Sequence, residues 1–247
     1  MLDWFRVIYE LIFLKALAFM SSSVPFSESF STISQQPEIF QWAKSHYRDR
    51  IFAKDERIPS RPGLLYLVES GAVRITGKAQ VNIESDGEHS ASAESEDVFL
   101  GFVGAGQPFE IVSQYPFKLS AYAHIEGTSL VWLYWQDLER WPLLRPLIVE
   151  TFRYQYQRKL FWLSILGQKR SIDRLMGFLA LLIEEYGQPC PDGYYLPYGL
   201  THAQIASAIG TTRVTVTRLM GKLKQKKLLF LKDDHLIGLP SLFISGN

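Results

Sequence analysis

The sequence predicts an α+β fold with a β-rich first half, one long helix and a small helical module at the C-terminus. Three observations lead to this prediction. Short apolar runs broken by glycines fill residues 51–135, no glycine or proline interrupts residues 147–166, and two short helical patterns flank Gly210. The length of 247 residues fits one large domain or two small ones, at about 150 residues per domain.

The composition is that of a globular chain. Hydrophobic residues make up 47% and charged residues 21% of the sequence, which excludes global disorder. The single cysteine, Cys190, cannot form an internal disulfide, a four-cysteine iron–sulfur cluster or a cysteine-type zinc site. We therefore expect no metal site and a cytoplasmic location, where thiols stay reduced.

Acidic and basic residues are separated along the chain, although the net charge is only +1. Residues 79–117 contain seven acidic residues and no Lys or Arg, whereas residues 199–232 contain seven basic residues and no acidic residue. Such segregation favours a basic module that binds a polyanion. A solvated helix face is the alternative interpretation.

Residues 1–41 are predicted to be a leader. Within them, residues 1–20 are strongly apolar but include four charged side chains, at Asp3, Arg6, Glu10 and Lys15. These charges argue against a membrane span or a secretory signal. Two interpretations remain open: an amphipathic helix that covers a hydrophobic surface, or an upstream start codon. In the second, which we favour, Met20 is the first native residue and precedes a flexible Ser-rich segment.

Residues 42–136 are predicted to form a small antiparallel roll or barrel. The apolar runs 63–68 and 72–75 have hairpin spacing, with a glycine at the turn. Further strand-like runs follow at 98–103, 121–125 and 129–134. The segment 84–96 is rich in Glu, Ser, Ala and Gly and is predicted to be a solvated loop.

Residues 137–168 are predicted to link the two halves and to dimerise. Asp137 is placed to cap a short helix through Arg140, and a longer helix covers 147–166. Side chains spaced alternately by four and three residues predict a coiled-coil seam at Leu147, Thr151, Tyr154, Arg158, Phe161 and Ile165. Phe152, Tyr156, Leu160 and Leu163 form an adjacent apolar face. Packing of this helix within one chain is the alternative to a dimer.

Residues 169–247 are predicted to form a winged helix-turn-helix. An amphipathic helix over 171–186 ends at a glycine, and residues 228–239 have the pattern of a β-hairpin wing. Between them, Thr201 and Gln204 form a capping box that starts one helix. Gly210 supplies the turn, and Thr212 caps the second helix. The inward positions of that second helix are Val216, Leu219 and Leu223.

The second helix is predicted to read DNA in the major groove. The candidate contact residues are Thr201, Thr211, Thr212, Arg213, Val214, Thr217, Arg218 and Lys222. Arg213 and Arg218 can each donate two hydrogen bonds to guanine, and Val214 can contact a thymine methyl. The threonines suit phosphate oxygens, and Lys222 and the lysines after it add attraction that does not depend on sequence. Plain surface solvation is the alternative for any one of these side chains.

The β-rich half, the long helix and the terminal module together resemble the cyclic-AMP-receptor/Fnr (Crp/Fnr) family of bacterial transcription regulators. The resemblance runs from Trp42 to Leu239. The segment IPSRPGLLYLVESGAVRI is similar to the family's opening strands, and IGTTRVTVTRLMGKL is similar to the cyanobacterial nitrogen-regulator subgroup, which responds to 2-oxoglutarate.

The resemblance implies a jelly-roll domain of the cyclic-nucleotide-binding type with an effector pocket beside the long helix. It also implies a homodimer on a palindromic double-stranded DNA site, with the recognition helices one DNA turn apart. RNA polymerase is a further partner if the protein activates transcription.

The effector is not predicted, and cyclic AMP is disfavoured. Family members that bind it carry a Phe-Gly-Glu segment and then an arginine that neutralises the phosphate. The matching stretch here is Gln107-Pro108-Phe109-Glu110, and no arginine lies between Lys78 and Arg140, so a buried phosphate would lack its bidentate partner. The weak candidates for ligand contacts are Phe109, Glu110, Lys118 and Arg158.

The nitrogen-regulator subgroup gives no clearer effector. Gln155 and Leu160 stand where that subgroup has charged ligand contacts, although Arg153 and Arg158 could substitute. His124 is either a haem ligand or a core histidine.

The prediction is a sequence-specific DNA-binding regulator, not an enzyme. His46, His89 and His124 do not have the spacing of a metal motif, and the sequence contains no nucleophile elbow or phosphate loop. No catalytic residue is predicted. The alternative is a DNA-binding protein that is independent of effectors, or regulated by a partner protein, with a vestigial ligand pocket.

Overall fold

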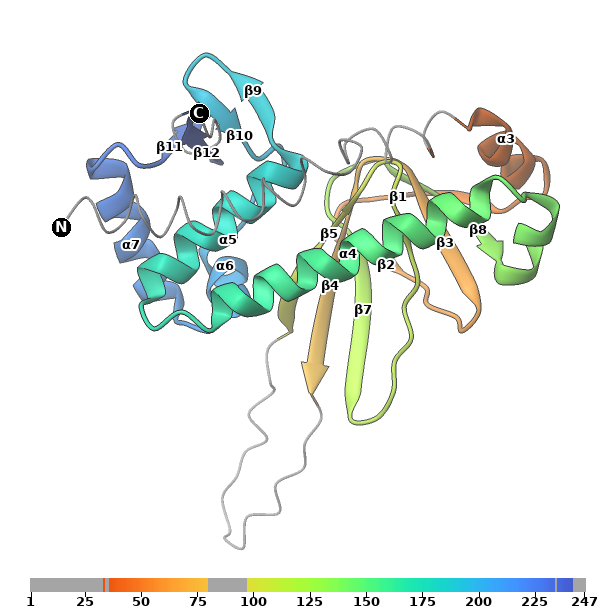
Figure 1. Cartoon of the computed structure of the whole chain (residues 1–247), viewed down its shortest axis with the longest axis horizontal. Helices are drawn as coiled ribbons and strands as arrows, with labels where there is room; N and C mark the ends of the chain where they lie inside the picture. The colour runs from red at the N-terminus through yellow and green to blue at the C-terminus, as the bar shows by residue number, and fades with distance from the viewer. Residues whose placement is uncertain (1–32, 34–35, 80–96, 234, 242–247) are drawn as a thin grey trace, which may run out of the picture.

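The computed structural model describes residues 33, 36–79, 97–233 and 235–241. A β-sheet half and a helical half lie side by side and are joined by one long helix, α4, which runs across both (Figure 1). Most of the predicted leader and the predicted loop 84–96 lie outside the described residues. No helix in the described ranges is long and apolar enough to span a bilayer.

The β half consists of two antiparallel four-stranded sheets, which confirms the predicted roll. One sheet has the order β1 (Asp49–Phe52), β8 (Thr128–Tyr134), β3 (Leu64–Ser70) and β6 (Pro108–Phe109). The other has the order β2 (Arg57–Ile58), β7 (Phe117–Ala123), β4 (Ala72–Ala79) and β5 (Val98–Gly104). The core between the sheets takes side chains from both, among them Tyr66, Val73 and Ala121.

The predicted hairpin of residues 63–68 and 72–75 is wrong, because β3 and β4 belong to different sheets. All five residues of Leu64–Val68 are buried. Leu64 and Tyr66 face the core between the sheets, whereas Leu65 and Leu67 pack in a second cluster with the helices. The continuous apolar run therefore marks a strand that is buried on both faces, and the chain changes sheet at Gly71.

Gly71 permits this change of sheet. Its φ is +88°, and a Cβ on it would lie 2.7 Å from Thr128 Oγ1 and 2.8 Å from Thr128 Cα. Both the backbone angle and the close approach require glycine.

Three helices cover the outer face of the first sheet: α3 (Pro37–Ser45), the short 3-10 helix η1 (Trp135–Arg140) and α4 (Leu144–Leu166). α3 starts within the predicted leader and buries Ile39 and Phe40. Asp137 does not occupy the predicted cap position. It is the third residue of η1, and its carboxylate accepts the backbone N–H of Tyr134 at 2.8 Å.

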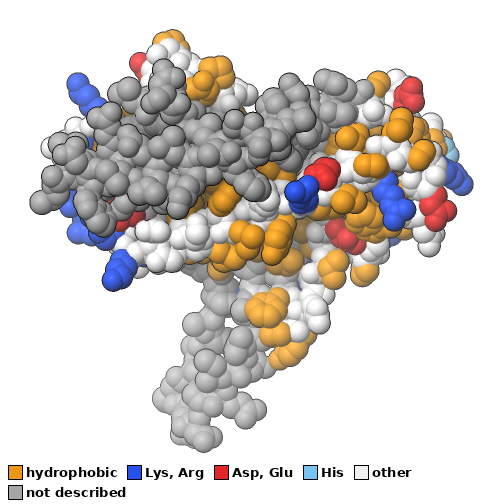
Figure 2. Space-filling model, in the orientation of Figure 1, with side chains coloured by type: hydrophobic (Ala, Val, Ile, Leu, Met, Phe, Trp, Pro, Cys, Tyr) orange, Lys and Arg blue, Asp and Glu red, His pale blue; other side chains and the backbone are white. Residues whose placement is uncertain are grey.

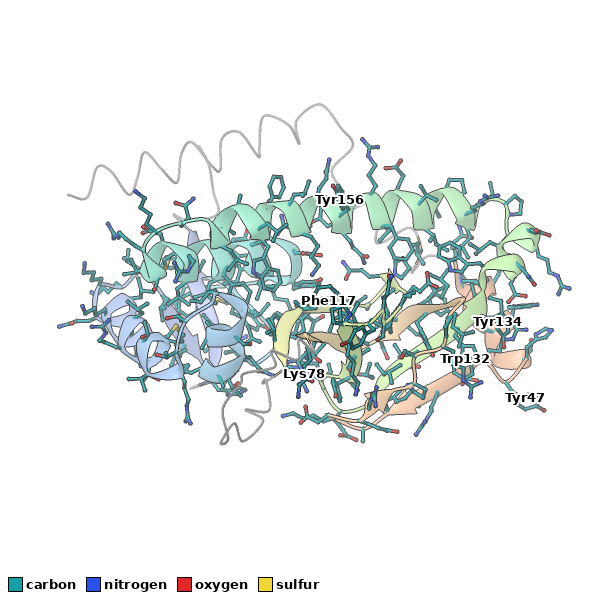
Figure 3. All side chains as sticks on the ribbon, turned by 90° about the horizontal axis from the view of Figure 1, so that it is seen from below. Tyr47, Lys78, Phe117, Trp132, Tyr134 and Tyr156 are labelled. Atoms are coloured by element: carbon teal, nitrogen blue, oxygen red, sulfur yellow. The ribbon has the colours of Figure 1, made fainter. Side chains whose placement is uncertain are left out.

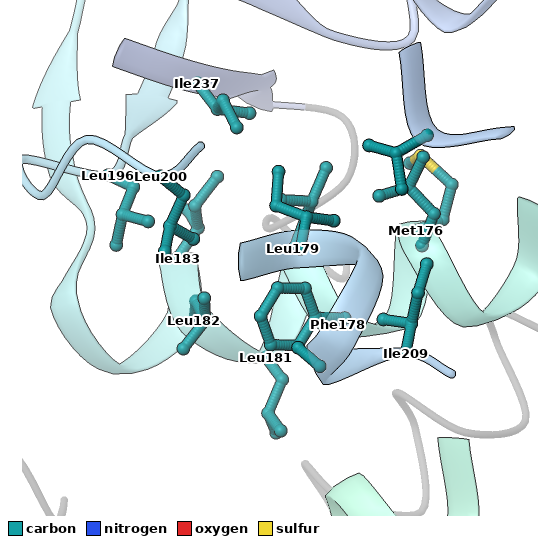
Figure 4. Close-up of a cluster of buried hydrophobic side chains, with 14 of the residues drawn as sticks. Met176, Phe178, Leu179, Leu181, Leu182, Ile183, Leu196, Leu200, Ile209 and Ile237 are labelled. Carbon is teal, nitrogen blue, oxygen red and sulfur yellow. The ribbon is translucent and has the colours of Figure 1, made fainter. Parts of the chain in front are cut away.

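The C-terminal half contains α5 (Ser171–Tyr186), α6 (His202–Ala208) and α7 (Arg213–Gln225). Its sheet has the order β11 (Phe230–Lys232), β12 (Leu236–Pro240), β10 (Gly193–Tyr195) and β9 (Gln188–Cys190). β11 and β12 form the predicted wing, and the β9–β10 hairpin is an addition that the sequence did not indicate. The core packs Phe178, Leu179 and Leu182 of α5 against residues such as Leu196, Ile209 and Ile237 (Figure 4).

Candidate DNA-binding site

The helix-turn-helix is built by two capped helices around a glycine turn. The Gln204 backbone N–H donates to Thr201 Oγ1 at 3.1 Å, and the Thr201 N–H donates to Gln204 Oε1 at 2.9 Å. This is the predicted capping box. Gly210 has a φ of +61°, and Thr212 Oγ1 accepts the N–H of Thr215 at 3.2 Å. The capping box fixes where α6 begins, the left-handed turn at Gly210 follows its end, and the Thr212 bond fixes where α7 begins.

One face of α7 is buried and the opposite face is open to solvent. Val216, Leu219 and Leu223 are buried as predicted, and Met220 joins them. On the open face, the apolar side chain of Val214 is 78% exposed. Because burial of a valine side chain against an apolar group is favourable, this residue is suited to a contact with a binding partner. The other exposed members of the predicted contact set on α7 are Arg213, Thr217, Arg218 and Lys222.

The exposed cations on α7 have no carboxylate partner within the described part of the chain. Among the described residues, Arg213, Arg218 and Lys222 form no ion pair. They are therefore available to a polyanion, and a positive face of this kind attracts phosphates without competition from nearby acids.

A groove of about 700 Å³ runs beside this face, between the start of α6, α7 and the wing. Its polar lining includes Thr201, His202, Arg213, Thr217, Lys224 and His235. His202 Nδ1 lies 2.8 Å from the Thr217 hydroxyl, which also donates to the Arg213 carbonyl at 3.0 Å. Thr217 is thus already hydrogen-bonded within the groove.

His202 and His235 were not among the predicted contact residues. The signal for His202 was its position directly after the capping threonine, at the first residue of α6. No sequence pattern marked His235.

The four candidate ligand contacts have different surroundings within the fold. Phe109 is buried and stacks on Tyr66, with ring centroids 5.1 Å apart. Glu110 accepts from the Gly63 N–H at 3.3 Å and from Trp135 Nε1 at 3.1 Å. Lys118 is exposed on β7.

Arg158 and Gln155 of α4 are also engaged within the chain. The Arg158 guanidinium pairs with Glu184 at 2.8 Å and with Glu185 at 3.3 Å. Gln155 Nε2 donates to the Pro108 carbonyl at 3.0 Å, which ties α4 to β6.

His124 is a core histidine at the boundary of the two halves. Its ring is 4% exposed and packs on Phe102 and Tyr198. Nε2 lies 2.9 Å from the Gly199 carbonyl and Nδ1 lies 3.5 Å from Arg74 Nη1, so Nε2 carries the proton and Nδ1 accepts. Burial lowers the pKa of His124 to about 4. The histidine is neutral near pH 7.

Comparison with known proteins identifies the family. The Crp-like helix-turn-helix domain family matches residues 173–241. The regulatory protein CysR of Synechococcus elongatus is 37% identical over 189 residues, which cover 73% of this chain and 78% of that protein. The chain belongs to the Crp/Fnr family of transcription regulators. CysR and the matching family are regulators and not enzymes, in agreement with the sequence prediction.

Other relatives of this Crp/Fnr regulator are similar over shorter stretches. The global nitrogen regulator of a Nostoc species is 37% identical over 94 residues, which cover 38% of this chain and 42% of that protein. The global nitrogen regulator of Synechococcus elongatus is 46% identical over 63 residues, or 28% of that protein. The chain thus matches less than half the length of these nitrogen regulators.

Solved structures share the fold at low sequence identity. A CooA mutant from Carboxydothermus hydrogenoformans has a TM-score of 0.59 and 22% identity, covering 78% of this chain and 83% of that chain. A cyclic nucleotide-binding domain containing protein from Listeria monocytogenes has a TM-score of 0.64 and 15% identity, covering 82% and 96%.

Proposed function

We propose that this Crp/Fnr regulator binds a palindromic promoter site as a homodimer in the cytoplasm, with one α7 in the major groove of each half-site. Arg213, Val214 and Arg218 contact base edges. Thr201, Thr211, Thr212, Thr217 and Lys222 contact the phosphate backbone. The observation that carries the proposal is the open face of α7, whose cations have no acidic partner in the described ranges.

His202, Lys224 and His235 join the backbone contacts in this proposal. They line the protein groove between α6, α7 and the wing. With α7 in the major groove of the DNA, the phosphate backbone beside that major groove would pass along the protein groove. RNA polymerase is the second macromolecular partner if the regulator activates transcription.

The homodimer is proposed to form through an outward apolar face of α4. Half of the six residues of the predicted seam, Thr151, Arg158 and Ile165, are buried within the chain, whereas Phe161 is 41% exposed. Val149, Tyr156, Leu160 and Leu163 are instead between 45% and 64% exposed. Figure 2 shows hydrophobic side chains gathered along this helix, and Figure 3 places Tyr156 on the side of α4 away from the sheets.

The spacing of this outward face supports a second copy as its occupant. Together with Arg153, residues 149, 156, 160 and 163 continue the alternation of four and three residues that two parallel helices need. Solvent-exposed apolar stripes of this length are rare in monomers.

The domain division follows the same proposal. Residues 42–136 form the effector-type domain, residues 137–168 the linking and dimerisation segment, and residues 169–247 the DNA-binding domain.

Selection of bound sites from a random DNA pool by the purified protein tests the proposal. We expect a palindrome whose half-sites are centred about one helical turn apart. An Arg213→Ala/Arg218→Ala double variant should enrich no such sequence. Enrichment of a single non-repeated site, or of the same palindrome by the double variant, would contradict the proposal.

Specific contacts also favour a second candidate: a regulator whose DNA binding does not depend on a small-molecule effector. Gln155 of α4 donates to the Pro108 carbonyl of β6, Phe109 stacks on Tyr66, and Arg158 pairs with two glutamates. These three side chains are therefore already engaged within the chain. A ligand that binds the folded state must raise the melting temperature. We expect no shift with 2-oxoglutarate or cyclic nucleotides, and a clear dose-dependent shift would refute this candidate.

A further inference from the structure

Arg174 lies where three segments of the chain meet, in the first turn of α5. Its Nε donates to the Ile209 carbonyl at 2.9 Å, and Nη1 donates to the Gln168 carbonyl at 2.9 Å and to the Lys169 carbonyl at 3.4 Å. Nη2 donates to Ser171 Oγ at 3.1 Å and to the Gly210 carbonyl at 3.4 Å. The five N–H donors of the guanidinium therefore meet five acceptors.

Four of the five acceptors are backbone carbonyls at or just beyond the C-terminal ends of α4 and α6. Ile209 is the residue that ends α6, Gly210 forms the helix-turn-helix turn, and residues 168–169 directly follow the end of α4. The last carbonyls of a helix lack partners within it, and a cation near them is favourable. Arg174 thus joins the end of α4 to the turn that precedes the recognition helix. Lysine cannot reproduce the five-donor fork.

Two other bonds hold the same end of α6. Trp162 Nε1, on α4, donates to the Ala208 carbonyl at 3.1 Å, and the Phe99 N–H, on β5, donates to Ser207 Oγ at 3.1 Å. The placement of the turn relative to α4 therefore rests on contacts to residues 207–210, only three residues before α7 begins at Arg213.

We infer that Arg174 is a positioning residue that sets the separation of the two recognition helices in the dimer. The inference rests on the proposed function, because α4 is the helix through which the second copy is held. Arg174 fixes the turn before α7 to the end of α4, so it determines where each α7 lies relative to its partner. The base preference within one half-site depends instead on side chains of α7, and the five hydrogen bonds of Arg174 described above all go to residues outside α7.

A set of palindromic duplexes tests this role. All of them carry the same half-site sequence, and the distance between the two half-sites differs by one or two base pairs from one duplex to the next. Arg174→Lys keeps the charge and removes the fork. We expect the ratio of affinities between the best and the neighbouring separations to fall about fivefold, the equivalent of one net hydrogen bond. The base preference of the half-site and the salt dependence should stay at the wild-type values.

Arg170→Lys is the matched control. Arg170, the residue that precedes α5, pairs with Asp173 of that helix, so the substitution keeps the charge and leaves the five bonds of Arg174 in place. Its separation preference should equal that of the wild type. Trp162→Phe removes the second bond from α4 and retains an aromatic ring in the core, so it should broaden the preference in the same direction even if Arg174→Lys fails to fold.

The possible outcomes distinguish the proposed dimer from the proposed positioning role of Arg174. A wild-type protein without any preference for separation would overturn the dimer on a palindrome. A wild-type preference that persists unchanged in folded Arg174→Lys, or in Trp162→Phe where Arg174→Lys does not fold, would overturn the positioning role alone. A loss of half-site base preference in Arg174→Lys would also overturn it, because α7 itself would then be altered.

Discussion

The exposed side chains of α7 and of the segment after it differ in what they can reach on DNA. Arg218 lies in the second turn of α7 with no carboxylate partner among the described ion pairs. Lys226 lies beyond the last residue of the helix. A guanidinium at a base edge reads sequence, whereas an ammonium beside the backbone contributes charge alone.

Arg218→Ala should therefore relax the base preference and also weaken binding by about 1–3 kcal/mol. Lys226→Ala should weaken binding to all sequences alike and reduce the salt slope by about one. Affinities for matched and mismatched duplexes at several salt concentrations separate the two effects. Equal loss of specificity in both variants would show that α7 is not the reading helix.

His124 makes stability depend on pH. Burial lowers its pKa from 6.5 to about 4 in the folded chain, so between these values the unfolded chain binds a proton that the folded chain does not. Stability is therefore complete above pH 6.5 and is lost as the pH falls toward 4, by up to about 3 kcal/mol.

His124→Gln removes the titration and keeps a donor for the Gly199 carbonyl. Urea unfolding at pH 7, 6, 5 and 4 should show a shallower loss of stability in the variant than in the wild type. Parallel losses in the two proteins would mean that the histidine does not carry this pH dependence.

At the scale of elements, α4 shows what the sequence could and could not predict. Local signals sufficed for α5, whose bounds Ser171–Tyr186 match the predicted helix, and for the capping box of α6. α4 carries apolar side chains on more than one stripe, and spacing alone does not say which stripe the chain's own core covers. Thr151, Arg158 and Ile165 are covered by the chain itself, and the outward stripe is offset from them by two residues, which places it on nearly the opposite side of the helix.

The spacing of the strands also left part of the fold unpredicted, namely the sheets to which β3 and β4 belong. The glycine at position 71 indicated a reversal of the chain, and the structure has one there. Hairpin spacing could not distinguish a reversal within one sheet from a crossing between two sheets. The burial of both faces of β3 depends on the helices packed behind it, which lie far away in the sequence.

Leu163→Lys tests the outward stripe. Leu163 is 62% exposed, so a lysine there costs the folded protomer little but places charges inside a paired-helix interface. We expect a shift from dimer to monomer in sedimentation velocity and a loss of affinity for the palindrome. Ile51→Lys, at a residue of β1 that is 69% exposed, is the matched control and should remain dimeric. A dimeric Leu163→Lys variant would place the interface elsewhere.

At the scale of the whole molecule, the two halves share a hydrophobic core. Phe99 and Phe102 of β5 are buried in the cluster formed by α5, α6 and α7. Trp162 of α4 belongs to the same cluster, and His124 reaches the Gly199 carbonyl across the boundary. The sheet half is thus packed directly on the helix-turn-helix, which gives any change in the roll a physical route to the DNA-binding surface.

Phe99→Ala should destabilise both halves together. The side chain is 1% exposed, and deleting a buried phenyl ring costs about 3–5 kcal/mol. Thermal unfolding should show one cooperative transition at a lower temperature, whereas Val98→Ala, at a residue that is 41% exposed, should leave it nearly unchanged. Two separate transitions in the wild type would indicate that the halves unfold independently.

The proposed dimer places two α7 helices on one duplex. Sedimentation equilibrium of the protein bound to a single selected palindrome measures this most directly. We expect two protomers per duplex. We also expect binding to be at least tenfold weaker when one half-site is scrambled, about the loss that follows from removing one set of base contacts. One protomer per duplex, or equal affinity for the scrambled site, would contradict the proposed dimer.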